Sequence, residues 1–284
     1  MTFGEIALPM LFAAFVWWFS TGAILWLDRL PRKTFVWTFS AASLIGAAAL
    51  FGLAATAADA SANGAYLAFT CAIAIWGWHE MSFLMGFILG PRREPCPIDA
   101  RGWQRFKLAT ATVIHHEVAL ALTALAVVAL TWGQPNQVGT LTFAVLWVMR
   151  LSAKFNLFLG ARHRGENLLP PHLQHLKSYF RQRSMNALFP VSLAGGAALA
   201  WTLASLAHAP AASPYEEVGF SLLLAMTLLA LVEHVFMFVP PPNTLLWGWA
   251  EPRQPQQLAV ANAPVRQITA STPKTPSSEI IHDL

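Results

Sequence analysis

The chain has 284 residues, of which 56% are apolar and only 11% are charged. A soluble domain carries about 25% charged residues to cover its surface, so this composition excludes a soluble protein and indicates one that faces lipid. The formal net charge of +4 does not predict a nucleic-acid partner, because in a membrane protein the position of Lys and Arg matters more than their total.

Stretches of about 20 apolar residues are long enough to cross the hydrocarbon core as a helix. Seven stretches qualify, and turn residues separate most of them; three consecutive prolines follow the last, where the missing amide donor stops a helix. The predicted spans cover residues 3–27, 34–57, 65–89, 108–132, 140–160, 187–207 and 218–239. They define a membrane domain over residues 1–250. Residues 251–284, rich in Pro, Gln, Ser and Thr, are predicted to form a disordered cytoplasmic tail.

Loops rich in Lys and Arg alternate strictly with loops that contain none. Of the 18 Lys and Arg residues, 16 follow odd-numbered spans, and the loops after the second, fourth and sixth spans contain none. Because Lys and Arg are retained in the cytoplasm during insertion, the N-terminus is predicted to be periplasmic and the C-terminus cytoplasmic. The predicted fold is therefore an all-α, polytopic membrane protein with seven transmembrane helices.

Ionisable side chains inside a membrane span are costly and are candidates for function. Four of the seven spans carry polar groups of this kind, and at a rise of about 1.5 Å per residue most fall roughly 9–15 Å below the cytoplasmic edge. Helices of both directions thus place histidines and carboxylates in one layer. The candidate residues are His79, Glu80, His115, His116, Glu117, Arg150, Lys154, Asn156, Glu233 and His234.

Three interpretations of this layer remain open. In the first, it binds iron or another transition metal, because imidazole and carboxylate ligands suit such ions; its ligands would be His79, Glu80, His115, His116, Glu117, Glu233 and His234. In the second, it binds a tetrapyrrole such as bacteriochlorophyll, with His79, His115, His116 or His234 on the central metal and Arg150, Lys154 or Asn156 on polar substituents. In the third, the charged groups pair with one another and only hold the helices together.

Short motifs near the end of the fifth span carry a family resemblance. The sequence from Lys154 to Gly160, then Leu169-Pro170 and Ser178-Tyr179-Phe180, resembles the PuhE family over about residues 1–250. That family comprises photosynthetic complex assembly proteins encoded beside the reaction-centre H-subunit gene in purple phototrophic bacteria.

The resemblance implies a multi-pass protein of the bacterial inner (intracytoplasmic) membrane, with lipid and reaction-centre or core antenna subunits as partners. It implies a non-enzymatic role in assembling the reaction centre and its core light-harvesting antenna, by modulating bacteriochlorophyll supply. One alternative is a metal-dependent oxidase or another enzyme of bacteriochlorophyll or carotenoid metabolism, in which Glu80, Glu117 or Glu233 acts as base or ligand. Another is a transporter of pigment or a small solute.

Overall fold

The computed structural model of the chain describes residues 3–163 and 169–239, with the side chains of 3–6 left aside. Within this part the structure is all-helical, and seven helices are long and apolar enough to cross a membrane, as predicted. They are α1 (Phe3–Leu27), α2 (Phe35–Thr56), α3 (Ala62–Leu84), α4 (Gly102–Thr131), α5 (Val138–Leu159), α6 (Leu188–Ala207) and α7 (Pro214–Phe236). The predicted disordered tail, residues 251–284, lies outside the described residues.

Two short 3-10 helices, η1 (Arg32–Thr34) and η3 (Pro171–Tyr179), lie in the loops after α1 and α5. Helix starts differ from the prediction by several residues where a polar side chain caps the helix. Ser61 accepts a hydrogen bond from the amide of Gly64, so α3 begins at residue 62 rather than 65. Ser213 and Glu216 form a capping box with Pro214 in the first turn, which starts α7 at residue 214 rather than 218.

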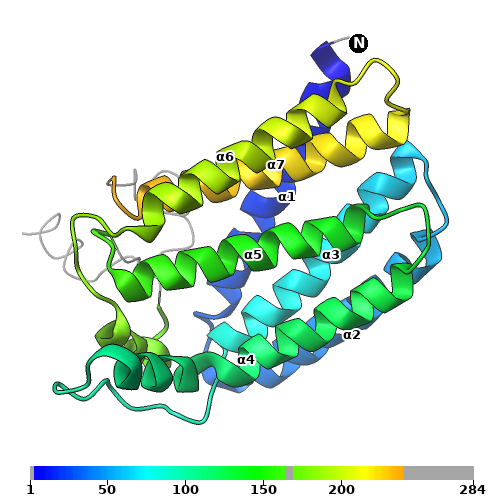
Figure 1. Cartoon of the computed structure of the whole chain (residues 1–284). Coiled ribbons are helices and arrows are strands. Elements are labelled where there is room, and N and C mark those ends of the chain that lie inside the picture. Colours follow the sequence, from blue (N-terminus) through cyan, green and yellow to red (C-terminus); the bar gives the residue numbers. More distant parts are fainter. Residues whose placement is uncertain (1–2, 164–168, 240–284) are drawn as a thin grey trace, which may run out of the picture. The chain divides into compact units, whose positions relative to one another are not determined.

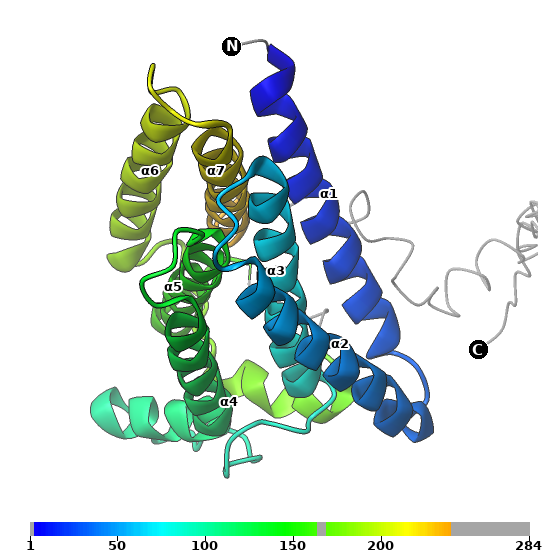
Figure 2. The same ribbon diagram turned by 90° about the vertical axis from the view of Figure 1, so that its right-hand side faces the viewer.

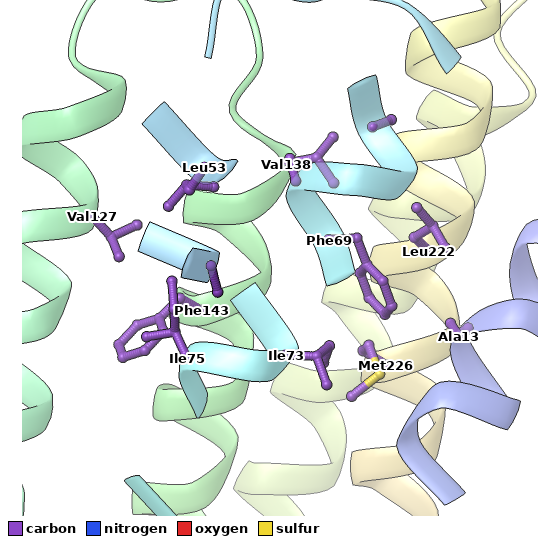
Figure 3. Packing of buried hydrophobic residues seen from close by; sticks show 14 of the residues in the cluster. Ala13, Leu53, Phe69, Ile73, Ile75, Val127, Val138, Phe143, Leu222 and Met226 are labelled. Carbon is purple, nitrogen blue, oxygen red and sulfur yellow. The ribbon is translucent and has the colours of Figure 1, made fainter. Parts of the chain in front are cut away.

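Helices α3 and α7 are the central helices of the bundle. Half of the most apolar window of each is buried, against 17% for α1, α2 and α4. Figures 1 and 2 show α3 with α1, α2 and α5 around it, and α6 lying along α7. The core brings together residues of α1, α2, α3, α4, α5 and α7, including Ala13, Leu53, Phe69, Val127, Phe143 and Leu222 (Figure 3).

The segment after α3 changes the course of α4. The amide of Arg92 donates to the carbonyl of Ala111, and the amide of His116 donates to the carbonyl of Leu89. Gly90 permits this approach, because a Cβ there would lie 2.1 Å from the Ala111 carbonyl oxygen. Hydrogen bonds between the backbone of a helix and a segment outside it are a common cause of helix bends. Both views show α4 changing direction along its length (Figures 1 and 2).

This crossing also explains a boundary that the prediction missed. The third span was predicted to continue to residue 89, but α3 ends at Leu84 and residues 85–92 form the segment that crosses α4. Gly86, with a φ of 84°, lies just after the helix end, where a left-handed residue commonly terminates a helix.

Candidate functional site

Two ion pairs join α5 to its neighbours. Arg150 Nη2 donates to Glu80 Oε2 of α3 at 2.9 Å, and Lys154 Nζ donates to Glu117 Oε1 of α4. Arg150 and Lys154 are four residues apart and therefore share one face of α5, as predicted. Both cations thus face carboxylates on two other helices, which connects three spans at one level.

A third carboxylate lies within reach of the Arg150–Glu80 pair. Glu233 of α7 interacts electrostatically with Arg150 and Glu80, and it is hydrogen-bonded to the side chain of Trp17 in α1. We refer to Glu80, Glu117, Arg150, Lys154 and Glu233 as the charged layer. It holds two cations and three carboxyl groups, so at full ionisation it carries one surplus negative charge.

The charged layer is incompletely covered by the protein. The side chain of Arg150 is 40% exposed and that of Lys154 27%, and Glu233 is exposed although it lies on a membrane-spanning helix. Hydrogen bonding is also incomplete within the described residues, where buried Glu80 Oε1, Glu117 Oε2 and Arg150 Nε have no partner. Polar groups buried without partners are costly, so further partners would stabilise this layer.

Two buried histidines lie beside the charged layer. His79 of α3 and His116 of α4 are each 1% exposed, and their ring centroids are 6.2 Å apart at an interplanar angle of 74°. His79 Nε2 is 2.9 Å from the Thr123 hydroxyl, while the Nδ1 atoms of both rings lack a partner among the described residues. The rings are surrounded by aromatic side chains, with Phe83 4.8 Å from His116. These two rings bring α3 and α4 into contact beside the charged layer.

His234 and Asn156 belong to a separate network on another face of α5. His234 Nε2 lies 2.9 Å from the Ser152 hydroxyl, which donates to Ser192 of α6 at 2.9 Å. The amide of Asn156 donates to the same Ser192 hydroxyl at 3.0 Å and to the Ser152 carbonyl at 2.9 Å. His234 Nδ1 is engaged with its own helix at the carbonyl of Ala230, 2.8 Å away. Both ring nitrogens of His234 thus have partners, and its Nε2 joins α7 to the network of α5 and α6.

His115 stands apart from the other candidates. It is exposed, whereas its neighbour His116 is buried, because adjacent residues on a helix point about 100° apart. In the part of the chain that the structure describes, no three His, Cys, Asp or Glu side chains converge in a way that would hold a metal ion. The geometry therefore gives the predicted metal site no support, and we derive no chemistry from it.

Four residues of these networks were absent from the predicted site: Trp17, Thr123, Ser152 and Ser192. Hydroxyl side chains in helices commonly bond to their own backbone four residues earlier, as Ser192 does at the Leu188 carbonyl, so they give no distinctive signal in a sequence. Of the four, Ser152 could have been identified from the sequence, because it lies four residues before the candidate Asn156 and therefore on the same face of α5.

Comparison with known proteins gives two matches. Residues 3–258 match a family described as "Protein of unknown function (DUF3623)". The chain is also 39% identical over 246 residues to the "Uncharacterized 30.4 kDa protein in puhA 5'region" of Rhodobacter capsulatus, an alignment that covers 84% of this chain and 88% of the relative. No solved structure gives a significant match.

Proposed function

The chain belongs to the DUF3623 family, and from that premise we propose that it assists assembly of the photosynthetic reaction centre and core antenna. The relative encoded in the puhA 5' region supports this proposal, as does the resemblance to the PuhE family. The proposed site of action is the bacterial inner (intracytoplasmic) membrane, with the N-terminus in the periplasm and the C-terminus in the cytoplasm. The alternation of Lys and Arg between loops supports this orientation.

The observation that carries the proposal is the exposure of the charged layer. Placing a charged group at the centre of a membrane span costs about 2.5–3.5 kcal/mol on insertion scales. Arg150 and Glu233 nevertheless keep side-chain surface that the described protein does not cover, so contact with the polar side chains of another membrane protein would reduce this cost. A surface of this kind suits a factor that holds a membrane subunit until the subunit enters its final complex.

Among the candidate histidines, His115 is the one accessible to a bacteriochlorophyll-type pigment. His79, His116 and His234 are each 1% exposed and are enclosed by side chains, whereas the imidazole of His115 is accessible. Val118 and Leu122, three and seven residues later on the same helix face, are 48% and 62% exposed and provide an apolar surface. A neutral imidazole can ligate the central magnesium of such a pigment, so we propose that His115 is the residue that would hold it.

Arg150 and Lys154 are less suited to binding the carboxylate of a pigment precursor than the sequence indicated. Each already has a glutamate partner, and the layer has one carboxyl group in excess. An anionic substituent would have to displace Glu80 or Glu117. We therefore assign the charged layer to a protein partner with hydrogen-bond donors, and the pigment to His115.

The assembly role is tested by removing one ion pair without changing the net charge. The double variant Glu80→Gln with Arg150→Gln is expected to lower the yield of reaction-centre and antenna subunits that co-purify with the full-length protein after crosslinking in phototrophic cells. Asp99→Asn with Arg101→Gln, two exposed loop residues, is the matched control and is expected to retain them. Equal yields from both double variants, at equal protein levels, would contradict the proposed partner site.

The pigment role needs a separate measurement. Protein purified from the same cells is expected to carry extractable pigment, and His115→Ala is expected to reduce it at least fivefold. His208→Ala, which removes an exposed histidine at the other end of the bundle, is expected to leave the pigment unchanged. A deletion strain that accumulates a single pigment precursor would instead support the alternative of a membrane enzyme.

A further inference from the structure

A cavity of about 180 Å³ lies among the basic loops, and a residue of η3 is part of its lining. Three segments that are far apart in the sequence form it: η1, the segment after α3, and η3. Its lining residues are Arg32, Met85, Gly86, Leu89, Arg93 and His172. Gly86 allows the His172 ring to approach closely, because a Cβ at residue 86 would lie 3.2 Å from His172 Cδ2.

The positive charge in this cavity is not neutralised by the protein. No acidic residue is among the lining residues, and neither Arg32 nor Arg93 forms an ion pair with any residue that the structure describes. The neighbouring Arg92 shows the contrast, since it pairs with Glu94 at 3.5 Å and donates to the Tyr179 hydroxyl at 2.6 Å. Two unpaired guanidinium groups on one small cavity favour an anion there.

His172 adds a third polar group with a free position. The backbone of Leu84 hydrogen-bonds to the ring, and the ring Nε2 is buried without a partner in the described structure. Burial lowers the pKa of His172, and the charges of Arg32, His175 and Arg93 lower it further, against the opposing effect of the Leu84 hydrogen bond. An anion in the cavity would offset these positive charges.

We propose that this cavity binds a phosphate group, and specifically the phosphate of an anionic phospholipid headgroup. Guanidinium groups bind phosphate oxygens in a fixed two-donor geometry, which makes Arg a preferred phosphate ligand. Met85 and Leu89 give the cavity an apolar side, which matches a phosphate attached to a glycerol and acyl chains better than a free ion. Its place at the end of the spans puts it at the depth of lipid headgroups. The proposal is independent of the assembly function.

The experiment measures binding to the full-length protein in a neutral detergent. Three probes are compared: dioctanoyl phosphatidylglycerol, dioctanoyl phosphatidylcholine and inorganic phosphate. Arg32→Gln and Arg93→Gln are each expected to weaken phosphatidylglycerol binding about tenfold, as expected for loss of one charge-assisted hydrogen bond. Lys33→Gln removes the same charge from the residue next to Arg32, outside the cavity lining, and is expected to change the affinity less than twofold.

Each outcome has a defined meaning. Binding of phosphatidylglycerol that is tenfold tighter than that of the other probes, and that depends on Arg32 and Arg93, supports the lipid site. Equal dependence on both arginines for inorganic phosphate, with no preference for lipid, overturns the lipid assignment and leaves a free-phosphate site. Equal losses of phosphatidylglycerol affinity in Arg93→Gln and Lys33→Gln overturn the assignment of the binding site to the cavity, because diffuse surface charge then explains the binding. Arg93→Lys, which keeps the charge, checks that the loss does not come from misfolding.

Discussion

The ion pair between Glu117 and Lys154 joins α4 to α5 within the membrane domain, and both side chains are mostly buried, with exposures of 18% and 27%. Breaking a buried pair by removing one partner leaves a charge without compensation, and the cost is about 3 kcal/mol. Glu117→Gln is therefore expected to lower the melting temperature in detergent. The double variant Glu117→Gln with Lys154→Met is expected to recover most of the loss, because neither partner of this pair is then left as an uncompensated charge.

The exposed carboxylate Glu94 provides the control for this cycle. Its side chain is 77% exposed and pairs with Arg92 at 3.5 Å, so Glu94→Gln is expected to change the stability by less than about 0.5 kcal/mol. If Glu117→Gln is no more harmful than Glu94→Gln, the pair inside the bundle does not contribute to stability.

Asp28 follows the last residue of α1, and the burial of its carboxyl group predicts that the stability of the folded protein depends on pH. It is 5% exposed, and neither carboxylate oxygen has a partner among the described residues. Burial raises the pKa of Asp28 to about 7, against the opposing effect of Arg29. The unfolded chain ionises near pH 4 and the folded protein only near pH 7, so this residue lowers stability progressively across that window and by a constant amount above it.

Asp28→Asn is therefore expected to raise the melting temperature at pH 8 and to leave it unchanged at pH 4. The measurement is a series of melting curves between these two values in one detergent. A stabilisation that is equal at both ends of the series would show that Asp28 is not a neutral, buried carboxyl group below pH 7.

At this scale the sequence identified polar residues within the spans as candidates, but not which way each of them faces. The spacing of Arg150 and Lys154 predicted their common face, and the structure confirms it. Spacing alone leaves the rotation of each helix undetermined, so His115 and His116 received the same assignment although one is exposed and the other buried. The 3.6-residue period gives relative directions along a helix, and only packing against other helices sets the absolute one.

At the scale of elements, Asn186 holds the end of α5 to the start of α6. Its side-chain amide donates to the carbonyls of Asn156 and Gly160, and its side-chain oxygen accepts from the amides of Leu188 and Phe189. Asn186→Ala leaves several of these backbone groups buried without partners, so we expect a loss of about 1–3 kcal/mol in unfolding free energy.

Thermal or denaturant unfolding in detergent measures the effect of Asn186→Ala. Asn63→Ala is the matched control, because Asn63 is exposed in the first turn of α3. A loss in the control as large as that in Asn186→Ala would show that the side-chain hydrogen bonds of Asn186 carry no special weight.

Some helix boundaries are set by a capping side chain at the helix end, and others by contacts with a distant segment of the chain. The starts of α3 and α7 depend on Ser61 and Ser213, whose side chains cap the first turns of these helices. The end of α3 and the bend of α4 depend instead on hydrogen bonds between residues 89–92 and 111–116. Contacts between segments some 20 residues apart leave no periodic signal, so hydropathy alone extended the third span too far.

At the scale of the whole molecule, the loops at one end of the bundle contain both the segment that hydrogen-bonds to the backbone of α4 and the proposed phosphate site. The segment after α3 contributes to both: Leu89 and Arg92 bond to the backbone of α4, and Arg93 lines the cavity beside Arg32 and His172. A ligand in the cavity would therefore contact the segment that bends α4 next to His116. The side of the membrane on which these loops lie therefore determines which ligands can reach the cavity.

The orientation of the bundle is testable with a native cysteine. Cys96 lies in the loop after α3 and is partly exposed, while Cys71 lies within α3. If basic loops are cytoplasmic, a membrane-impermeant maleimide should label Cys96 in inside-out vesicles and not in intact spheroplasts. A Cys71→Ser background isolates this signal, and Cys96→Ser should abolish it. Labelling in spheroplasts would reverse the orientation and place the basic cavity in the periplasm, where the retention of Lys and Arg offers no explanation for it.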